Sequence, residues 1–203
     1  MQVTLNKTIS SGLKCLSLIA AVFVGGCVMI PYETPEARAK IEHDLKLSPS
    51  DIQGITETNW CLYPYGSNPA CTVTKGLGVL TRQGLILSLY EGKTYKQALK
   101  LKSEQINCAK TVEGRDAQEV FVVFTDQMGV MLAPITPGGQ LNMPLKIKFF
   151  DYLMSRNQPV FKGKDGVYVK ETDKREYGGG MIAGTTIPYA TSHAIWTTVN
   201  PCP

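Results

Sequence analysis

Several features that commonly mark enzymes are rare or missing in this chain of 203 residues. It has only two histidines, and no GxSxG, HExxH or CxxC motif occurs in it. Ser192 and His193 are neighbours, but adjacent residues of a strand point to opposite faces and cannot form a relay alone. Asp51, Glu57 and Asp126 fall at turns or strand ends, where we expect them to face solvent. The sequence therefore predicts no catalytic site and no metal or cofactor, and an enzyme is the least favoured class.

A long apolar run is also missing. The most apolar stretch, Cys15 to Val24, is about ten residues, against the roughly 20 that a bilayer-spanning helix needs. Lys7 and Lys14 precede this stretch, and no acidic residue occurs before Glu33. A basic start and a short apolar run followed by small residues are typical of a secretory signal. We therefore expect residues 1–26 to be a signal peptide.

The residues that end this segment, Val24-Gly25-Gly26-Cys27, resemble the lipobox of bacterial lipoproteins. In that family the cysteine thiol takes a diacylglyceryl group and a peptidase cuts just before it. The resemblance implies that Cys27 is lipidated and becomes the first mature residue. Gly25 departs from the alanine or serine that is more common in the family. The alternative is an ordinary cleaved signal in which Cys27 has no special role.

The same resemblance implies a place in the cell. In enterobacteria-like sorting, an aspartate directly after the lipidated cysteine retains the protein in the inner membrane, and Val28 stands there instead. For a Gram-negative organism this implies the outer membrane, with the protein on its periplasmic face. Several acyl chains make a stable anchor because each buried methylene contributes about 0.8 kcal/mol.

Charge of one sign does not dominate the chain. It has 21 basic and 17 acidic residues, and 19 and 17 once the two lysines of the signal are removed. This balance is not typical of nucleic-acid binding, so we expect no such partner. Lys93, Lys96, Lys100 and Lys102 form either a basic face or only the solvated side of a strand.

Four of the six cysteines lie beyond the signal and the lipobox, at Cys61, Cys71, Cys108 and Cys202. An even number in an oxidising compartment predicts two disulfides, for which three pairings are possible. We favour Cys61–Cys71 with Cys108–Cys202, because the loop between Cys61 and Cys71 is rich in turn-forming proline, glycine and asparagine. A zinc site is the competing interpretation, but the cysteine spacing and the two histidines do not favour it.

Helix and strand signals alternate along the mature chain. Thr34 and Pro35 suit the start of a helix over residues 34–47. Asn142 suits the start of a second helix, which carries an apolar stripe of Leu145, Phe149, Phe150, Leu153 and Met154. Between them, alternation and turn residues predict strands at residues 54–64, 72–81, 84–90, 94–103, 117–126 and 129–135.

Meandering strands followed by one amphipathic helix predict an α+β, mainly β fold. In this fold a curled antiparallel sheet or partial barrel is closed by the helix. Residues 76–154, and above all the stretch GLGVLTRQGLILSLYEGKTYKQALKLKSEQINCAK, resemble the pleckstrin-homology superfold and its GRAM-like branch. The resemblance implies a PH/GRAM-like domain over residues 51–158. A lipidated tether with a short helix precedes it at 27–50, and a strand-rich extension follows at 159–203.

The extension contains three consecutive glycines, Gly178 to Gly180, which we expect to form a flexible turn between strands. Tyr177 and Tyr189 flank these glycines, and Tyr63 and Tyr65 lie within the Cys61–Cys71 loop. Tyrosine combines a large apolar area with a polar tip and suits recognition surfaces. We therefore expect these four tyrosines to be exposed in a binding surface; the alternative is that they pack under their loops.

The sequence favours a non-catalytic, membrane-anchored lipoprotein of the bacterial envelope that binds a protein, a peptide or another ligand. Open strand edges would also allow a peptide to be captured as an added strand. The alternative is a structural envelope lipoprotein that assembles with its own copies or joins a larger complex. The membrane, reached through the lipid, and an envelope partner are thus the expected contacts.

Overall fold

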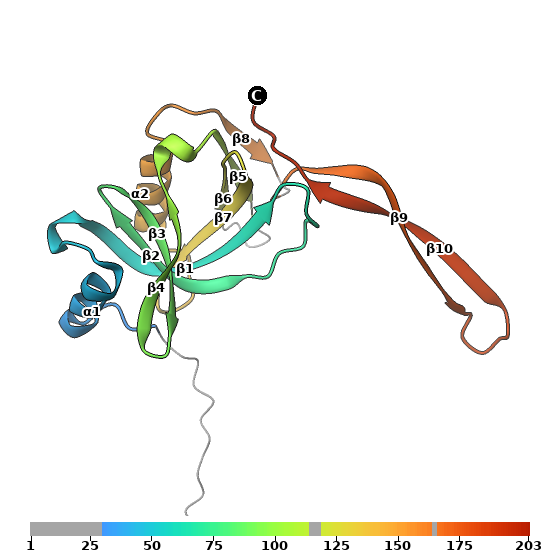
Figure 1. Cartoon of the computed structure of the whole chain (residues 1–203), viewed down its shortest axis with the longest axis horizontal. Coiled ribbons are helices and arrows are strands. Elements are labelled where there is room, and N and C mark those ends of the chain that lie inside the picture. Colours follow the sequence, from blue (N-terminus) through green and yellow to red (C-terminus); the bar gives the residue numbers. More distant parts are fainter. Residues whose placement is uncertain (1–29, 114–118, 164–165) are drawn as a thin grey trace, which may run out of the picture.

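The computed structural model describes residues 30–113, 119–163 and 166–203, so the predicted signal and Cys27 lie outside the described residues. A curled, eight-stranded sheet forms the body (Figure 1), in the spatial order β4-β3-β2-β1-β7-β6-β5-β8. The strands are β1 (Ile52–Pro64), β2 (Thr74–Thr81), β3 (Gly84–Glu91), β4 (Thr94–Leu101), β5 (Cys108–Glu113), β6 (Glu119–Phe124), β7 (Met128–Ile135) and β8 (Val160–Gly163). The protein is mainly β, as the sequence predicts.

Strand β1 is the centre of this sheet, because it pairs antiparallel with β2 on one side and with β7 on the other. From it, two meanders run outwards, β2-β3-β4 and β7-β6-β5. Strand β8 then adds to β5 in parallel, although its residues belong to the predicted extension. Among the described residues the sheet does not close into a barrel, and β4 and β8 form its two ends.

Helix α2 (Met143–Leu153) packs inside the curve of the sheet. It begins as predicted, since Asn142 Oδ1 accepts a hydrogen bond from the Leu145 N–H at 3.3 Å. Phe149 and Leu153 are fully buried against side chains from every strand between β1 and β7. A side chain at Gly78 would start 2.7 Å from Phe149 Cε2, so glycine at this position lets the aromatic ring approach β2. The predicted apolar stripe thus forms the centre of the core.

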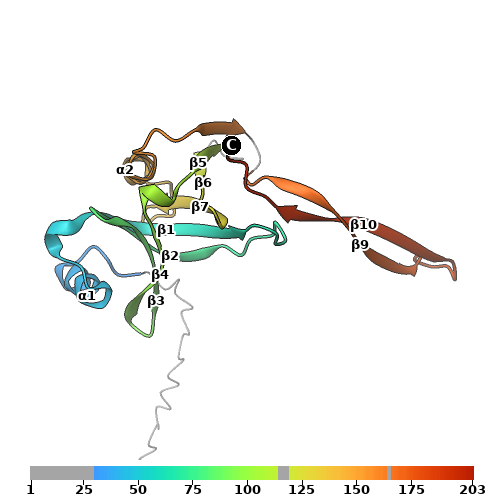
Figure 2. The same cartoon turned by 45° about the horizontal axis from the view of Figure 1, so that its top comes forward.

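Helix α1 (Pro35–Leu45) covers the opposite face of the sheet (Figure 2). Thr34 caps it as predicted, because its Oγ1 accepts a hydrogen bond from the Ala37 N–H at 3.2 Å. Ile41 is fully buried in a second apolar cluster with residues of β2, β3 and β4. Two short 3₁₀ turns, Pro49–Asp51 and Ser103–Gln105, connect α1 to β1 and β4 to β5.

Strands β9 (Val169–Met181) and β10 (Pro188–Thr198) form a separate two-stranded ribbon that projects from the body (Figures 1 and 2). We call this ribbon the arm. The expected turn at Gly178 to Gly180 is wrong, because these glycines lie within β9 and pair with Thr191, Ala190 and Tyr189. The connection between the strands lies instead at residues 182–187. The strand tolerates glycine here because β10 pairs along it and the ring of Tyr189 lies next to Gly180.

Two disulfides are present, Cys61–Cys71 and Cys108–Cys202, which are the pairs that the sequence favours. The first closes the loop between β1 and β2. The second ties the C-terminal end of the chain to β5 and contributes to a third apolar cluster on the outer face of the sheet.

Candidate protein-binding site

The far half of the arm is uncharged and apolar. Between Tyr177 and Ser192 the chain has no acidic residue, lysine or arginine. Five large side chains of this segment are exposed, with exposed fractions from 48% to 79%: Tyr177, Met181, Ile182, Ile187 and Tyr189. We call this segment, residues 177–192, the arm tip. Its composition contrasts with the near half of β9, where Glu171, Lys174 and Arg175 are among the charged residues.

Both faces of the arm tip offer contact surface. Directly paired residues of an antiparallel ribbon point to the same face. Met181 pairs with Pro188 and Tyr177 with Ser192, which places these four side chains on one face. Tyr189, opposite Gly180, lies on the other face. The two tyrosines of the predicted binding surface that belong to the arm are therefore exposed, but on opposite sides of the ribbon.

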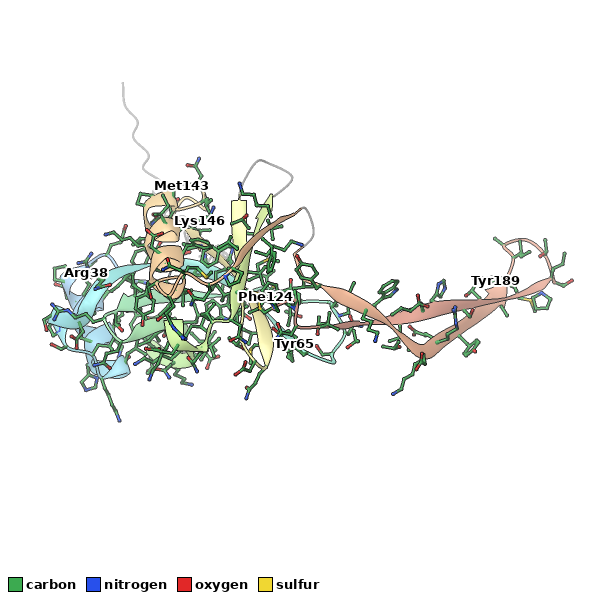
Figure 3. The ribbon with its side chains drawn as sticks, turned by 90° about the horizontal axis from the view of Figure 1, so that it is seen from above. Arg38, Tyr65, Phe124, Met143, Lys146 and Tyr189 are labelled. Carbon is green, nitrogen blue, oxygen red and sulfur yellow. A yellow bond between two sulfur atoms is a disulfide. The ribbon has the colours of Figure 1, made fainter. Side chains whose placement is uncertain are left out.

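The root of the arm is fixed to the loop that the Cys61–Cys71 disulfide closes. Thr198 is 2% exposed; its N–H donates to the Ser67 carbonyl and its carbonyl accepts from the Gly66 N–H, both at 2.9 Å. The hydroxyl of Thr198 also donates to the Pro64 carbonyl. A further bond of 3.0 Å joins the Val199 N–H to the Tyr168 carbonyl. The body therefore holds the start of the arm rigidly while its tip extends into solvent (Figure 3).

Tyr63 and Tyr65, the other two predicted binding residues, are not exposed as expected. Tyr63 belongs to β1 and is 7% exposed. The Tyr65 hydroxyl donates to the Thr125 carbonyl at 3.0 Å, and its ring packs near Phe124 (Figure 3). Burial, helped by the nearby charge of Asp126, raises the pKa of Tyr65 to about 12. Tyr63 is covered because it lies within β1, and Tyr65 because its ring packs in the apolar cluster on the outer face of the sheet.

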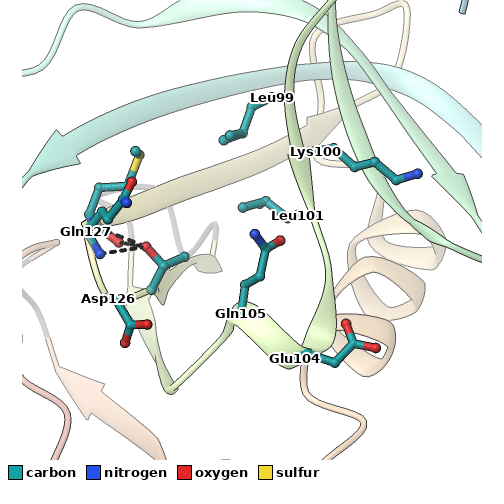
Figure 4. A pocket seen from close by; sticks show the side chains of 9 residues that line it. Leu99, Lys100, Leu101, Glu104, Gln105, Asp126 and Gln127 are labelled. Atoms are coloured by element: carbon teal, nitrogen blue, oxygen red, sulfur yellow. Dashed lines mark hydrogen bonds between the residues drawn. The ribbon is translucent and has the colours of Figure 1, made fainter.

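A cleft of about 270 Å³ lies on the open side of the curled sheet (Figure 4). The end of β4 and the turn after it supply Leu99, Leu101 and Gln105, and the β6–β7 turn supplies Asp126 and Met128. Asp126 faces solvent, as expected, and its Oδ1 accepts a hydrogen bond from Asn107 Nδ2 at 2.7 Å. Lys100, Glu104, Thr125 and Gln127 also line the cleft, so most of its lining is polar.

Glu57, which we expected to face solvent, is buried in β1. It is 2% exposed, and its Oε2 lies 2.8 Å from the half-exposed Lys75 Nζ. Tyr32 lies beside it, and burial raises the pKa of this tyrosine. A buried carboxylate needs such a partner, since an unpaired one would be costly to desolvate. Glu57 is therefore held in an ion pair at the surface of the sheet.

Ser192 and His193 lie on opposite faces of β10, because β9 pairs them with Tyr177 and Glu176 respectively.

In the described segments no helix is both long enough and apolar enough to cross a membrane. No protein-family model, no curated protein and no solved structure matches this chain. The site is therefore defined by its geometry alone.

Proposed function

We propose that this protein is a non-catalytic lipoprotein of the bacterial cell envelope that binds another envelope protein through the arm tip. The observation that carries the proposal is the uncharged segment 177–192, whose large apolar side chains are exposed. A two-stranded ribbon has no interior in which to bury such side chains, and is at best marginally stable alone. Apolar groups gathered on a surface commonly mark a contact with another protein.

We further propose that the body is a pleckstrin-homology or GRAM-like domain that serves as a scaffold. Two observations support this: strands β1 to β7 run antiparallel in a sheet whose two ends, β4 and β8, do not pair, and helix α2 follows β7 and packs into the curve. The cleft in Figure 4 lies between the end of β4 and the β6–β7 turn. The scaffold fixes the root of the arm, so the tip is presented in one direction.

The lipid anchor at Cys27 and the periplasmic face of the outer membrane belong to the same proposal. The basic start, the short apolar run and the Val24–Cys27 motif support them. The Cys61–Cys71 and Cys108–Cys202 disulfides are also typical of an oxidising compartment. A protein held at the membrane surface by acyl chains would meet partners of the envelope first.

Site-specific photocrosslinking in living cells tests this function. A photoreactive amino acid is placed at Tyr189 in the arm tip and, as the matched control, at Ile147, which is 52% exposed on α2 of the body. We expect one discrete adduct with a different envelope protein from Tyr189 and none from Ile147. Equal patterns from both positions, or no adduct from the arm tip, would contradict the proposal.

Self-assembly is the second candidate, and one observation favours it. The outer face of the sheet has a small apolar cleft of about 200 Å³, whose lining includes Trp60, Val73 and Met131. Val73 is 62% exposed there. An uncharged arm tip from a second copy would match this cleft in polarity. In the same crosslinking experiment an adduct with the mass of two copies would select this alternative.

A further inference from the structure

The first three described residues are packed firmly against the body. Ile30 and Tyr32 are 7% and 8% exposed, in the cluster that also contains Ile41 of α1 and Tyr95 of β4. The Tyr95 hydroxyl donates a hydrogen bond to the Pro31 carbonyl. The chain is thus held by the folded body from Ile30 onwards.

Only a very short length of chain separates this packed segment from the proposed lipid. Cys27 and Ile30 are three peptide steps apart. At about 3.8 Å per step, their Cα atoms are at most about 11 Å apart, even in a fully extended chain. The headgroup layer of one leaflet is itself roughly 5–8 Å thick. A body tied this closely to acyl chains has no room to stand clear of the membrane.

Helix α1 and the turn between β3 and β4 flank the packed segment. Asp44 of α1 joins them, because its Oδ2 accepts a hydrogen bond from the Tyr95 N–H at 3.0 Å. The rings of Tyr90 and Tyr95, one on each strand of the β3–β4 hairpin, lie 4.8 Å apart. Figure 1 shows that the described chain begins beside α1 and this hairpin.

We infer that the face formed by α1 and the β3–β4 turn lies directly on the lipid headgroups and is the membrane-contact surface of the protein. This inference rests on the lipidation of Cys27 in the proposed function and extends it, because it names the face that touches the lipid. The lipid tether, and not a basic patch, brings this face to the membrane.

The charges on this face would not by themselves attract it to a membrane. Two of its cations have acidic partners: Lys40 Nζ lies 3.1 Å from Asp44 Oδ2, and Lys96 Nζ lies 3.1 Å from Glu91 Oε2. Glu33 and Glu36 add negative charge close to the packed segment. A mixed surface of this kind has no strong attraction to anionic lipids, which polybasic segments need for binding. Contact should therefore depend little on headgroup charge.

Fluorescence quenching on vesicles tests the inference with the full lipidated protein. A fluorescent amino acid is placed at Lys93 in the β3–β4 turn or, as the control, at the exposed Lys162 in β8. The vesicles contain phosphatidylethanolamine with a quencher-labelled headgroup, with or without phosphatidylglycerol. We expect several-fold stronger quenching at Lys93 than at Lys162, in both vesicle types. A Gly/Ser linker of about 20 residues, inserted before Ile30 and spanning roughly 25 Å on average, should abolish the difference.

The outcomes separate this inference from the proposed function. Flotation with the vesicles, compared with the Cys27→Ser variant, reports the lipid anchor independently of quenching. If the protein floats but the two positions are quenched equally, or the linker changes nothing, the membrane-contact face is wrong while the anchor stands. If the protein floats no better than Cys27→Ser, the anchor fails, and the contact face fails with it.

Discussion

At the scale of single residues, Asp44 connects α1 to the sheet. Its carboxylate accepts hydrogen bonds from the Tyr95 N–H and from Lys40, and lies 3.1 Å from His43 Nδ1. The bond from the Tyr95 backbone and the one from His43 lower the pKa of Asp44 to about 2. In the unfolded chain an aspartate has a pKa of about 3.9. The folded protein therefore stabilises the ionised form of Asp44 relative to the unfolded chain.

This shift predicts how the stability of the protein depends on pH. The stabilisation from Asp44 is fully present above about pH 4 and is lost as the pH falls through about 2. We expect Asp44→Asn to lower the urea midpoint at pH 7, with a deficit that shrinks as the pH approaches 2. Asp151→Asn, at an exposed carboxylate on α2, is the control and should have little effect. A deficit of Asp44→Asn that stays constant down to pH 2 would contradict the assignment.

At the scale of elements, the arm tip contributes little to the stability of the body. The described attachments of the arm are at its root, around Thr198 and Val199. The arm tip can be removed by replacing residues 177–192 with Asn-Gly. Glu176 and His193 are paired across the two strands, so a two-residue turn can connect them. We expect the free energy of unfolding of the body to change by less than about 0.5 kcal/mol, as for most surface changes. Thermal unfolding of the shortened protein measures this.

A root substitution is the control for the arm deletion. Thr198→Val keeps the shape of the side chain but removes the hydroxyl that donates to the Pro64 carbonyl. It should destabilise the protein by about 1 kcal/mol, more than the deletion does, because the buried Thr198 side chain loses this hydrogen bond. If deletion of the arm tip destabilises the body more than Thr198→Val does, the prediction that the arm tip contributes little to stability is wrong.

The sequence predicts the elements with clear local signals. Alternation and turn residues locate β1 to β4, β6 and β7, and the Gly92-Lys93 turn has the two positive φ angles that a type I′ hairpin requires. Strand β5 is not predicted from the sequence because it is short and Lys110 interrupts the apolar residues of its outer side. In the structure Lys110 is buried, and its Nζ lies 4.4 Å from the centre of the Tyr168 ring. That contact depends on residues distant in sequence, which local patterns do not report.

The candidate site was only partly predictable for the same reason. Tyr177 and Tyr189 are exposed because they belong to a ribbon with no covering layer. Tyr63 and Tyr65 also lie near turn-forming residues, but Tyr63 belongs to a central strand paired with β7 and Tyr65 packs near Phe124 of β6. The parallel pairing of β8 with β5 likewise depends on the return of the chain after α2. Exposure is thus a property of the assembled sheet and not of a short sequence window.

At the scale of the whole molecule, the two disulfides close loops of very different length. Cys61–Cys71 spans 10 residues, and Cys108–Cys202 spans 94. In the chain-entropy account the longer loop contributes almost 5 kcal/mol and the shorter about 3, because the longer loop restricts the unfolded chain more. Cys202 also packs in the cluster that covers the outer face of β5 and β6.

We therefore expect loss of Cys108–Cys202 to be the more damaging change. Replacing both of its cysteines by serine should lower the free energy of unfolding by roughly 2 kcal/mol more than the same change at Cys61 and Cys71. Denaturant unfolding of the two double variants, compared with the unchanged protein, measures the difference. Equal losses, or a larger loss at Cys61 and Cys71, would show that loop length does not govern the effect.

The position of the longer disulfide has one more consequence, which concerns cleavage of the chain. The whole arm lies between Cys108 and Cys202 in the sequence. Its exposed ribbon, with Lys174 and Arg175 near the middle, is the kind of segment that proteases cut first. A nick there would leave two fragments that remain one covalent molecule, with the root still bonded to the body. The fragments would separate only after reduction, so the damage would be invisible on a non-reducing gel.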